Sequence, residues 1–161
     1  MVWQLRRATF DDLDAIMAIE TTTFGSDAWS AATMSAELRN ANTYYIVAFV
    51  PETPGAIVAY AGLLAPRRAA QADIQTIAVV ETSRRQGLGH TLVRSLITEA
   101  RSRGADEVFL EVRADNPAAQ SVYASIGFER IAVRAAYYQP EGVDAIVMRY
   151  VIPEPTVVVA S

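Results

Sequence analysis

The chain has no cysteine and only one histidine, His90, among its 161 residues. Without thiols it cannot form a disulfide, bind a metal through sulfur or use a thiolate nucleophile. A metal site rich in histidine is also disfavoured, and a Ser-His-Asp triad would have to use His90. No apolar run approaches the roughly 18 residues that a membrane-spanning helix needs. We therefore expect a chemistry that needs no metal, in a protein that does not cross a membrane.

An excess of basic residues is missing as well. The 14 lysines and arginines are outnumbered by 18 acidic residues, so the net charge of −4 does not indicate direct nucleic-acid or membrane binding. The N-terminus lacks the apolar segment of a signal peptide, and we expect a cytoplasmic protein, monomeric or weakly dimeric. The length and the 52% content of hydrophobic residues suit one domain with a sizeable core. We predict this domain over residues 1–152 and a flexible C-terminal tail over residues 153–161.

Apolar periodicity and turn signals divide the chain into seven strands and four helices. Ser30 and Asn116 are expected N-caps, and Gly104 and Gly127 mark two helix ends. We expect strands over residues 3–7, 44–50, 56–64, 72–80, 107–113, 128–136 and 145–151, and helices that begin near residues 9, 30, 87 and 116. A right-handed helical crossover makes strands 72–80 and 107–113 parallel neighbours. This order predicts a three-layer α/β domain.

The fourth expected strand contains an irregularity. Ile74 lies on even parity, whereas Ile77 and Val79 lie on odd parity. Because side chains alternate with a period of two, the buried face switches within the strand. One inserted residue near Gln75 and Thr76, a β-bulge, would produce the switch. The alternative is a strand covered on both faces, for which parity carries no information.

A short basic glycine loop, Arg84 to Gly89, stands between this strand and the next helix. A helix N-terminus presents free N–H groups and a positive dipole end, so the loop predicts an anion site, with phosphate as the natural ligand. The loop lacks the Gly-Lys-Ser/Thr ending of a Walker motif, and Leu92 stands where a dinucleotide fingerprint needs glycine. The pattern that fits is R-x-x-G-x-G, formed by Arg84, Gly87 and Gly89.

With this motif the sequence resembles the GNAT superfamily of acetyl-CoA-dependent N-acetyltransferases, over nearly the whole chain to about Val151. It is further similar to the RimI type, which acetylates protein N-terminal α-amines, notably of a ribosomal protein. The supporting stretches are residues 77–79, 85–89, 110–116, 121–128 and 137–138. Departures are Val80-Glu81 where Asp-Pro is usual, and His90 where a basic residue is common. The resemblance implies a three-layer fold with a mixed central sheet of about seven strands and helices on both faces.

The resemblance also implies a cofactor site for acetyl-CoA. Residues 77–79 would supply backbone donors to the thioester, and the glycine loop would cradle the pyrophosphate. The implied cofactor-binding residues are Ile77, Ala78, Val79, Arg84, Arg85, Gln86, Gly87, Leu88, Gly89, His90, Asn116 and Tyr123. For His90 an exposed helix position is the simpler interpretation. Asn116 has a plain role as an N-cap, to which the family adds a contact with the pantetheine arm.

Two catalytic residues are implied, Glu111 as general base and Tyr123 as general acid. A glutamate with an ordinary pKa of about 4.3 is a weak base near neutrality, so it needs a partly desolvated site or a water relay. A phenol near pKa 10 can protonate a thiolate near pKa 8.5 at small cost. The structural alternatives are a glutamate paired with Arg113 or another arginine, and an ordinary helix aromatic.

The substrate is expected to be the N-terminal peptide of a protein, ribosomal by resemblance. Glu111, Tyr137 and Tyr138 are the implied substrate contacts, although the tyrosines also suit plain edge-strand packing. An α-amine has a pKa of about 7.7 to 8.0 and lysine about 10.4, so deprotonating lysine costs roughly 3 kcal/mol more. That difference favours the α-amine. Acetylation of lysine or a small amine, and a non-catalytic acetyl-CoA-binding module, remain the alternatives.

Overall fold

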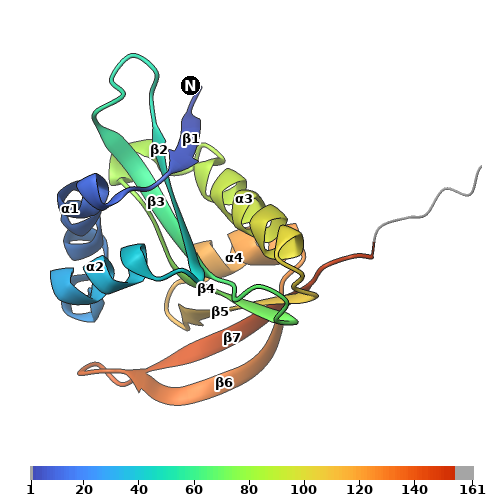
Figure 1. The fold of residues 1–161 in the computed structure, drawn as a ribbon. Coiled ribbons are helices and arrows are strands. Elements are labelled where there is room, and N and C mark those ends of the chain that lie inside the picture. The colour runs from blue at the N-terminus through green and yellow to red at the C-terminus, as the bar shows by residue number, and fades with distance from the viewer. Residues whose placement is uncertain (1, 155–161) are drawn as a thin grey trace, which may run out of the picture.

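One seven-stranded sheet, in the order β1-β2-β3-β4-β5-β7-β6, runs through the computed structural model, which describes residues 2–154 (Figure 1). The strands are β1 (Gln4–Arg7), β2 (Thr43–Phe49), β3 (Ile57–Leu64), β4 (Gln71–Val79), β5 (Glu107–Arg113), β6 (Glu129–Tyr138) and β7 (Val143–Val151). Neighbouring strands are antiparallel except for β4 and β5, which are parallel. The mixed sheet and the parallel pair confirm the sequence-based prediction.

Helices cover both faces of this sheet, α1 and α2 on one and α3 and α4 on the other (Figure 1). The helices are α1 (Leu13–Phe24), α2 (Ala31–Arg39), α3 (Leu88–Ser102) and α4 (Pro117–Ile126), with short 3-10 turns η1 (Phe10–Asp12), η2 (Gly25–Asp27) and η3 (Glu81–Ser83). Ser30 and Asn116 cap α2 and α4 through their side chains, as expected. Gly104 and Gly127, with φ of 99° and 124°, follow α3 and α4. The three-layer prediction is confirmed.

Each layer of helices encloses its own hydrophobic core. Leu88, Leu92 and Leu96 of α3 are buried against β3, β4 and β5, with Ile126 of α4 in the same cluster. On the other face, Ile16, Ile19 and Met34 from α1 and α2 pack on β2 and β3. Burying one large aliphatic side chain contributes roughly 1.5–3 kcal/mol relative to exposure. Both faces of the central strands are therefore fixed in place.

β4 contains the predicted bulge. Gly62 of β3 pairs with Thr76 and Leu63 pairs with Ile74, so Gln75 has no partner on β3. Before the bulge Ile74 faces the α3–α4 core, and after it Ala78 faces the α1–α2 core. The hydroxyl of Tyr45 donates to Gln75 Oε1 at 2.7 Å and holds the extra residue.

In the C-terminal part of the sheet, the strands do not follow their order along the chain. β7 lies between β5 and β6, and it pairs with β5 over the whole length of that strand. β6 continues two residues beyond its predicted end, so Tyr137 and Tyr138 belong to the edge strand. Arg101 Nη2 donates to the carbonyl oxygen of Pro153 at 3.1 Å, and residues 155–161 of the expected tail lie outside the described residues.

Two absences hold for residues 2–154. No helix there combines the length and apolar character needed to span a membrane. No three His, Cys, Asp or Glu side chains within that range are grouped so as to hold a metal ion.

Candidate active site

β4 and β5 part after the first third of β4. Their parallel pairing covers only residues 71–73 of β4 and 107–109 of β5. Beyond the bulge, Ile77, Ala78 and Val79 pair with β3 on one side, and none of them pairs with β5 on the other. A strand edge without a partner leaves backbone N–H and C=O groups free to bind a ligand. The three residues predicted to supply donors to a thioester line this gap.

The two faces of β5 lead to different sides of the sheet. Val108, Leu110 and Val112 face the α3–α4 core. Glu111, on the opposite parity, therefore faces the side of α1 and α2. Tyr123 of α4 belongs to the α3–α4 core. The two predicted catalytic residues thus lie on opposite faces of the sheet, beside the part of β4 that does not pair with β5.

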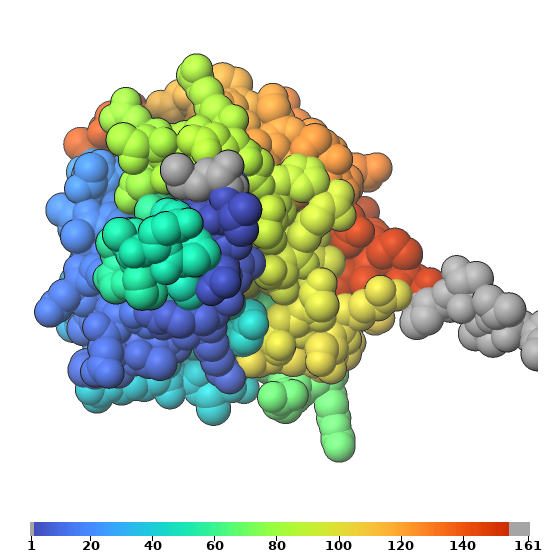
Figure 2. Space-filling model, turned by 90° about the horizontal axis from the view of Figure 1, so that it is seen from above, coloured from blue at the N-terminus to red at the C-terminus, as the bar shows by residue number. Residues whose placement is uncertain are grey.

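The glycine loop forms an anion cradle at the start of α3. Gly87 is its N-cap, with φ of 84°, and Arg85 also adopts a left-handed φ of 63°. Thr91 makes the first intrahelical bond to Gly87, so the N–H groups of the first turn remain available. Arg84, Arg85 and Gln86 are exposed, and the loop forms part of the surface in Figure 2. The groups predicted to bind phosphate, which are the loop side chains and the free N–H groups of α3, therefore lie together at the start of this helix.

Gly89 provides a test of whether a phosphate fits. Its φ lies outside the left-handed region, and a Cβ placed on it would meet no protein atom within 4 Å. Neither backbone conformation nor packing explains a glycine at this position. A ligand approaching the backbone does explain it, because only glycine leaves the first turn of α3 bare. The loop thus leaves room for the predicted pyrophosphate of coenzyme A, and its binding there stays a prediction.

Three of the predicted cofactor residues have specific partners. Arg84 Nε donates to the carbonyl oxygen of Val79 at 2.8 Å, tying the loop to the strand end. His90 Nδ1 accepts from Arg94 Nε at 3.2 Å, a contact along the surface of α3. Asn116 Oδ1 accepts from the N–H of Ala119 at 3.2 Å, which confirms its role as N-cap. Contacts of these residues with a cofactor stay predictions.

Glu111 is paired with Arg134 rather than with Arg113. Its carboxylate lies 3.1 Å from Arg134 Nε, and the side chains of Glu111 and Arg134 are 29% and 57% exposed. An ion pair this open to water stabilises the fold by less than about 1 kcal/mol. Arg134 can therefore release the carboxylate to an incoming amine at little cost.

Tyr123 and Tyr138 have perturbed hydroxyls. Desolvation by burial, with a smaller effect of Tyr138, raises the pKa of Tyr123 well above its usual range. Burial and then the nearby Glu111 carboxylate raise the pKa of Tyr138 to about 12. Both phenols thus remain protonated donors at neutral pH.

Tyr137 and Tyr138 stack edge to face, with ring centroids 5.1 Å apart. The guanidinium of Arg134 lies 5.7 Å from the Tyr137 ring and that of Arg113 lies 5.1 Å from the Tyr138 ring. Tyr137 is nearly half exposed. The pair therefore stands at the site on the face that carries Glu111, where it can contact a substrate.

Two acidic residues at the site were not among the predicted site residues. Asp73 lies on the same face of the sheet as Glu111, because its neighbours Ala72 and Ile74 face the α3–α4 core. Desolvation and then the Glu111 carboxylate raise the pKa of Asp73. Asp27 of η2 bonds Arg113 Nη1 at 2.6 Å and contributes to the raised pKa of Tyr138. Both come near Glu111 only through the tertiary fold, and no local pattern marks them.

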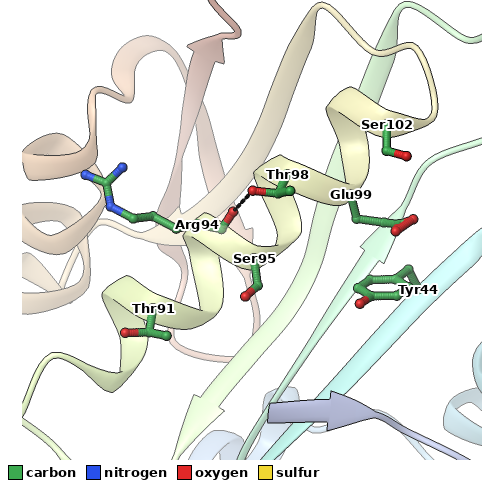
Figure 3. A pocket seen from close by; sticks show the side chains of 7 residues that line it. All are labelled: Tyr44, Thr91, Arg94, Ser95, Thr98, Glu99 and Ser102. Atoms are coloured by element: carbon green, nitrogen blue, oxygen red, sulfur yellow. Dashed lines mark hydrogen bonds between the residues drawn. The ribbon is translucent and has the colours of Figure 1, made fainter. Parts of the chain in front are cut away.

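A separate hollow on the surface does not belong to this site. It lies along the exposed side of α3 beside the Tyr44 ring (Figure 3). Its lining consists of Tyr44, Thr91, Arg94, Ser95, Thr98, Glu99 and Ser102. None of the predicted cofactor, catalytic or substrate residues lines it.

Comparison with known proteins finds a matching family and similar proteins. Residues 11–128 match the model of the acetyltransferase (GNAT) family. The chain is 36% identical over 127 residues to the N-alpha-acetyltransferase RimI of Mycobacterium tuberculosis, covering 78% of this chain and 77% of that protein. It is 32% identical over 151 residues to a putative ribosomal protein bS18-alanine N-acetyltransferase of Bacillus subtilis, covering 93% and 96%.

Two further matches differ in how much they cover. An uncharacterized Mycobacterium leprae protein is 37% identical over 141 residues, which are 86% of this chain and only 38% of that longer protein. The crystal structure of the ribosomal-protein-S18-alanine N-acetyltransferase from Escherichia coli superposes with a TM-score of 0.84 at 29% identity, covering 99% of this chain and 100% of that one. The agreement over complete chains confirms the predicted fold.

Proposed function

The chain belongs to the GNAT acetyltransferase family and is an acetyl-CoA-dependent acetyltransferase, and from this premise we propose that it acetylates the N-terminal α-amine of a protein. The names of its relatives in Bacillus subtilis and Escherichia coli suggest the acceptor, the N-terminal alanine of ribosomal protein bS18. A ribosomal acceptor would place the reaction in the cytoplasm.

The observation that carries the proposal is the gap between β4 and β5, with Glu111 on one face and Tyr123 on the other. The glycine loop opens α3, so acetyl-CoA lies on the α3–α4 side and its thioester enters the gap. The amine enters from the α1–α2 side, where Glu111, Asp73 and Tyr138 gather. Both substrates are held at once, which suits direct transfer in a ternary complex.

Each proton has a residue to receive or supply it. Glu111 takes a proton from the ammonium form of the substrate, directly or through a water, and the free amine attacks the thioester carbonyl. Backbone N–H groups of residues 77–79 stabilise the oxyanion that develops there. Tyr123 then protonates the departing sulfur. The second proton, which the attacking nitrogen loses as it becomes an amide, returns to the Tyr123 phenolate directly or through water. The desolvation that raises the pKa of this phenol also raises that of a thiolate beside it, so the transfer remains feasible.

An α-amine suits this site better than lysine does. Deprotonating an α-amine near neutrality costs roughly 3 kcal/mol less than deprotonating lysine. The proposed base for that step is one weak carboxylate, that of Glu111, whose partner is Arg134. A lysine substrate would need a stronger base than this arrangement provides.

The test measures release of free coenzyme A with a panel of acceptors. One peptide carries the first residues of bS18 with a free α-amine, a second is the same peptide with an acetylated N-terminus and one internal lysine, and a third acceptor is a small polyamine. We expect turnover only with the free α-amine, and mass spectrometry should locate the acetyl group there. Equal turnover of the lysine peptide or the polyamine would reject the proposed substrate class. Binding of acetyl-CoA without turnover of any amine would reject catalysis.

A further inference from the structure

Arg113 is the last residue of β5 and lies two positions beyond Glu111, on the same face of the strand. Its guanidinium contacts carboxylates from three separate segments. It bonds Asp115 twice, at 2.9 and 3.0 Å, bonds Asp27 through Nη1 at 2.6 Å, and lies 3.9 Å from a Glu141 oxygen. These contacts join the connection between α1 and α2, the start of α4 and the turn between β6 and β7.

The three carboxylates have different roles. Asp115 is only two residues away in sequence and is more than half exposed, so its bidentate contact mainly orients the guanidinium. Asp27 is 86 residues away and its side chain is only 18% exposed. A short charge-assisted bond that is partly shielded from water is stronger than a surface pair. The contact between Arg113 and Asp27 is therefore the one that fixes distant segments together.

A second anchor holds the same connection on its other side. The buried carboxylate of Glu20 accepts a bond from the backbone N–H of Trp29 at 2.9 Å. Glu20 also accepts from the Tyr60 hydroxyl, and Tyr60 lies on β3. The segment from Asp27 to Trp29 is thus fixed to β5 at one end and to the middle of the sheet at the other.

We propose that Arg113 and Asp27 form a latch that positions one wall of the peptide entrance, and that both are positioning residues for the protein substrate. The proposal rests on the proposed function. The same guanidinium stacks 5.1 Å from the ring of Tyr138, so it also places the opposite wall, the end of β6. Glu111 lies on the same face of β5, two residues before Arg113, and the latch sets where the first peptide residue sits relative to this base.

The test compares Asp27→Asn with a matched control. Asn preserves the size of the side chain and removes its charge. The control is Asp12→Asn, which weakens another partly shielded ion pair, the two bonds of 2.7 and 2.8 Å between Arg6 and Asp12 of η1. For Asp27→Asn we expect the peptide KM to rise about tenfold, with kcat and the acetyl-CoA KM within twofold of the wild type. For Asp12→Asn all three constants should stay within twofold.

Hydrogen exchange supplies a readout that does not depend on turnover. Asp27→Asn should speed exchange at two amides of this connection, that of Ala28, which donates to Gly25, and that of Trp29, which donates to Glu20 of α1. Asp12→Asn should not. In a double-mutant cycle, adding Asp27→Asn to Arg113→Gln should raise the peptide KM by less than twofold further.

The outcomes separate the two proposals. An unchanged peptide KM in Asp27→Asn, or equal losses in peptide and acetyl-CoA KM, would overturn the latch while leaving the proposed function in place. Additive effects in the cycle would overturn it as well. The proposed function is rejected by a different result, which is wild-type protein that acetylates no N-terminal peptide. In that case the role of the latch in peptide binding is rejected too.

Discussion

Glu20 and Glu111 are two glutamates beside the central strands of the same sheet, and they are held in opposite ways. Glu20 is 1% exposed and accepts bonds from the Trp29 N–H, the Tyr60 hydroxyl and the more distant Thr76 hydroxyl. Glu111 is more than a quarter exposed and has one arginine partner, itself largely open to solvent.

The difference lies in what each carboxylate can still do. A buried carboxylate is tolerated only when its oxygens are satisfied, and once satisfied it cannot change partners without a large penalty. Glu20 is therefore fixed as a structural group. An accessible carboxylate with one weak partner can exchange that partner for a substrate. Glu111 retains this freedom, which a general base needs. The mutations below should affect rate at one site and stability at the other.

The largest effect is expected for Glu111→Gln. The amide keeps the shape of the side chain and cannot accept the proton, so kcat should fall about 10²- to 10⁴-fold, or roughly 3–5 kcal/mol in the barrier. The midpoint of thermal unfolding should change little, because only the exposed pair with Arg134 is lost. A pH–rate profile measured beside the wild type checks the assignment. A kcat within threefold of the wild type would exclude Glu111 as the base.

Glu20→Gln should produce the converse result. The amide nitrogen cannot accept a bond, so either the Trp29 N–H or the Tyr60 hydroxyl loses its acceptor in a buried site. An unsatisfied buried donor costs about 1–3 kcal/mol, and urea denaturation should show a loss of this size. Saturated kcat, measured well below the unfolding midpoint, should stay within a few fold. A loss of rate with unchanged stability would give Glu20 a direct catalytic role and remove the contrast.

Tyr123→Phe should lower kcat by about 10- to 100-fold, roughly 1.4–2.7 kcal/mol. The ring packs near Phe128, with centroids 6.0 Å apart, and phenylalanine preserves that packing. Acetyl-CoA affinity and stability should therefore be close to those of the wild type. The control replaces acetyl-CoA with an acetyl thioester whose thiol is a better leaving group, because such a thiol needs less help from a general acid. If the variant's defect is the same with both thioesters, Tyr123 is not the general acid.

The sequence identified features whose cause is local. The β5 boundaries, the Asn116 cap and the bulge at Gln75 depend on residues close in the chain, and the structure has them where they were predicted. The insertion of β7 between β5 and β6 carries no local signal, because tertiary packing decides which of the two strands pairs with β5.

The site shows the same division. Glu111 and Tyr123 were proposed through motifs and family resemblance, and the placement of the two on opposite faces follows from strand parity and the α4 position. The arginine partner of Glu111 is Arg134, which comes from β6. Asp27, which contacts Arg113, lies 86 residues before it in the sequence. Such contacts are consequences of the completed fold, so spacing along the sequence could not predict them.

The smallest effect extends the comparison from glutamates to the two loop glycines. Gly87 needs its left-handed φ, so Gly87→Ala should cost roughly 1–2 kcal/mol of stability. Gly89 has room for a Cβ and lies inside α3, so Gly89→Ala should leave stability unchanged or raise it by a few tenths of a kcal/mol. Gly89→Ala should instead weaken acetyl-CoA binding, because the added methyl occupies space that a phosphate approaches. We expect the acetyl-CoA KM to rise about fivefold and the peptide KM to stay unchanged. Titration calorimetry with coenzyme A and with its dephosphorylated pantetheine fragment distinguishes the cause: the variant should weaken binding of the first only, and equal weakening of both would place the pyrophosphate elsewhere.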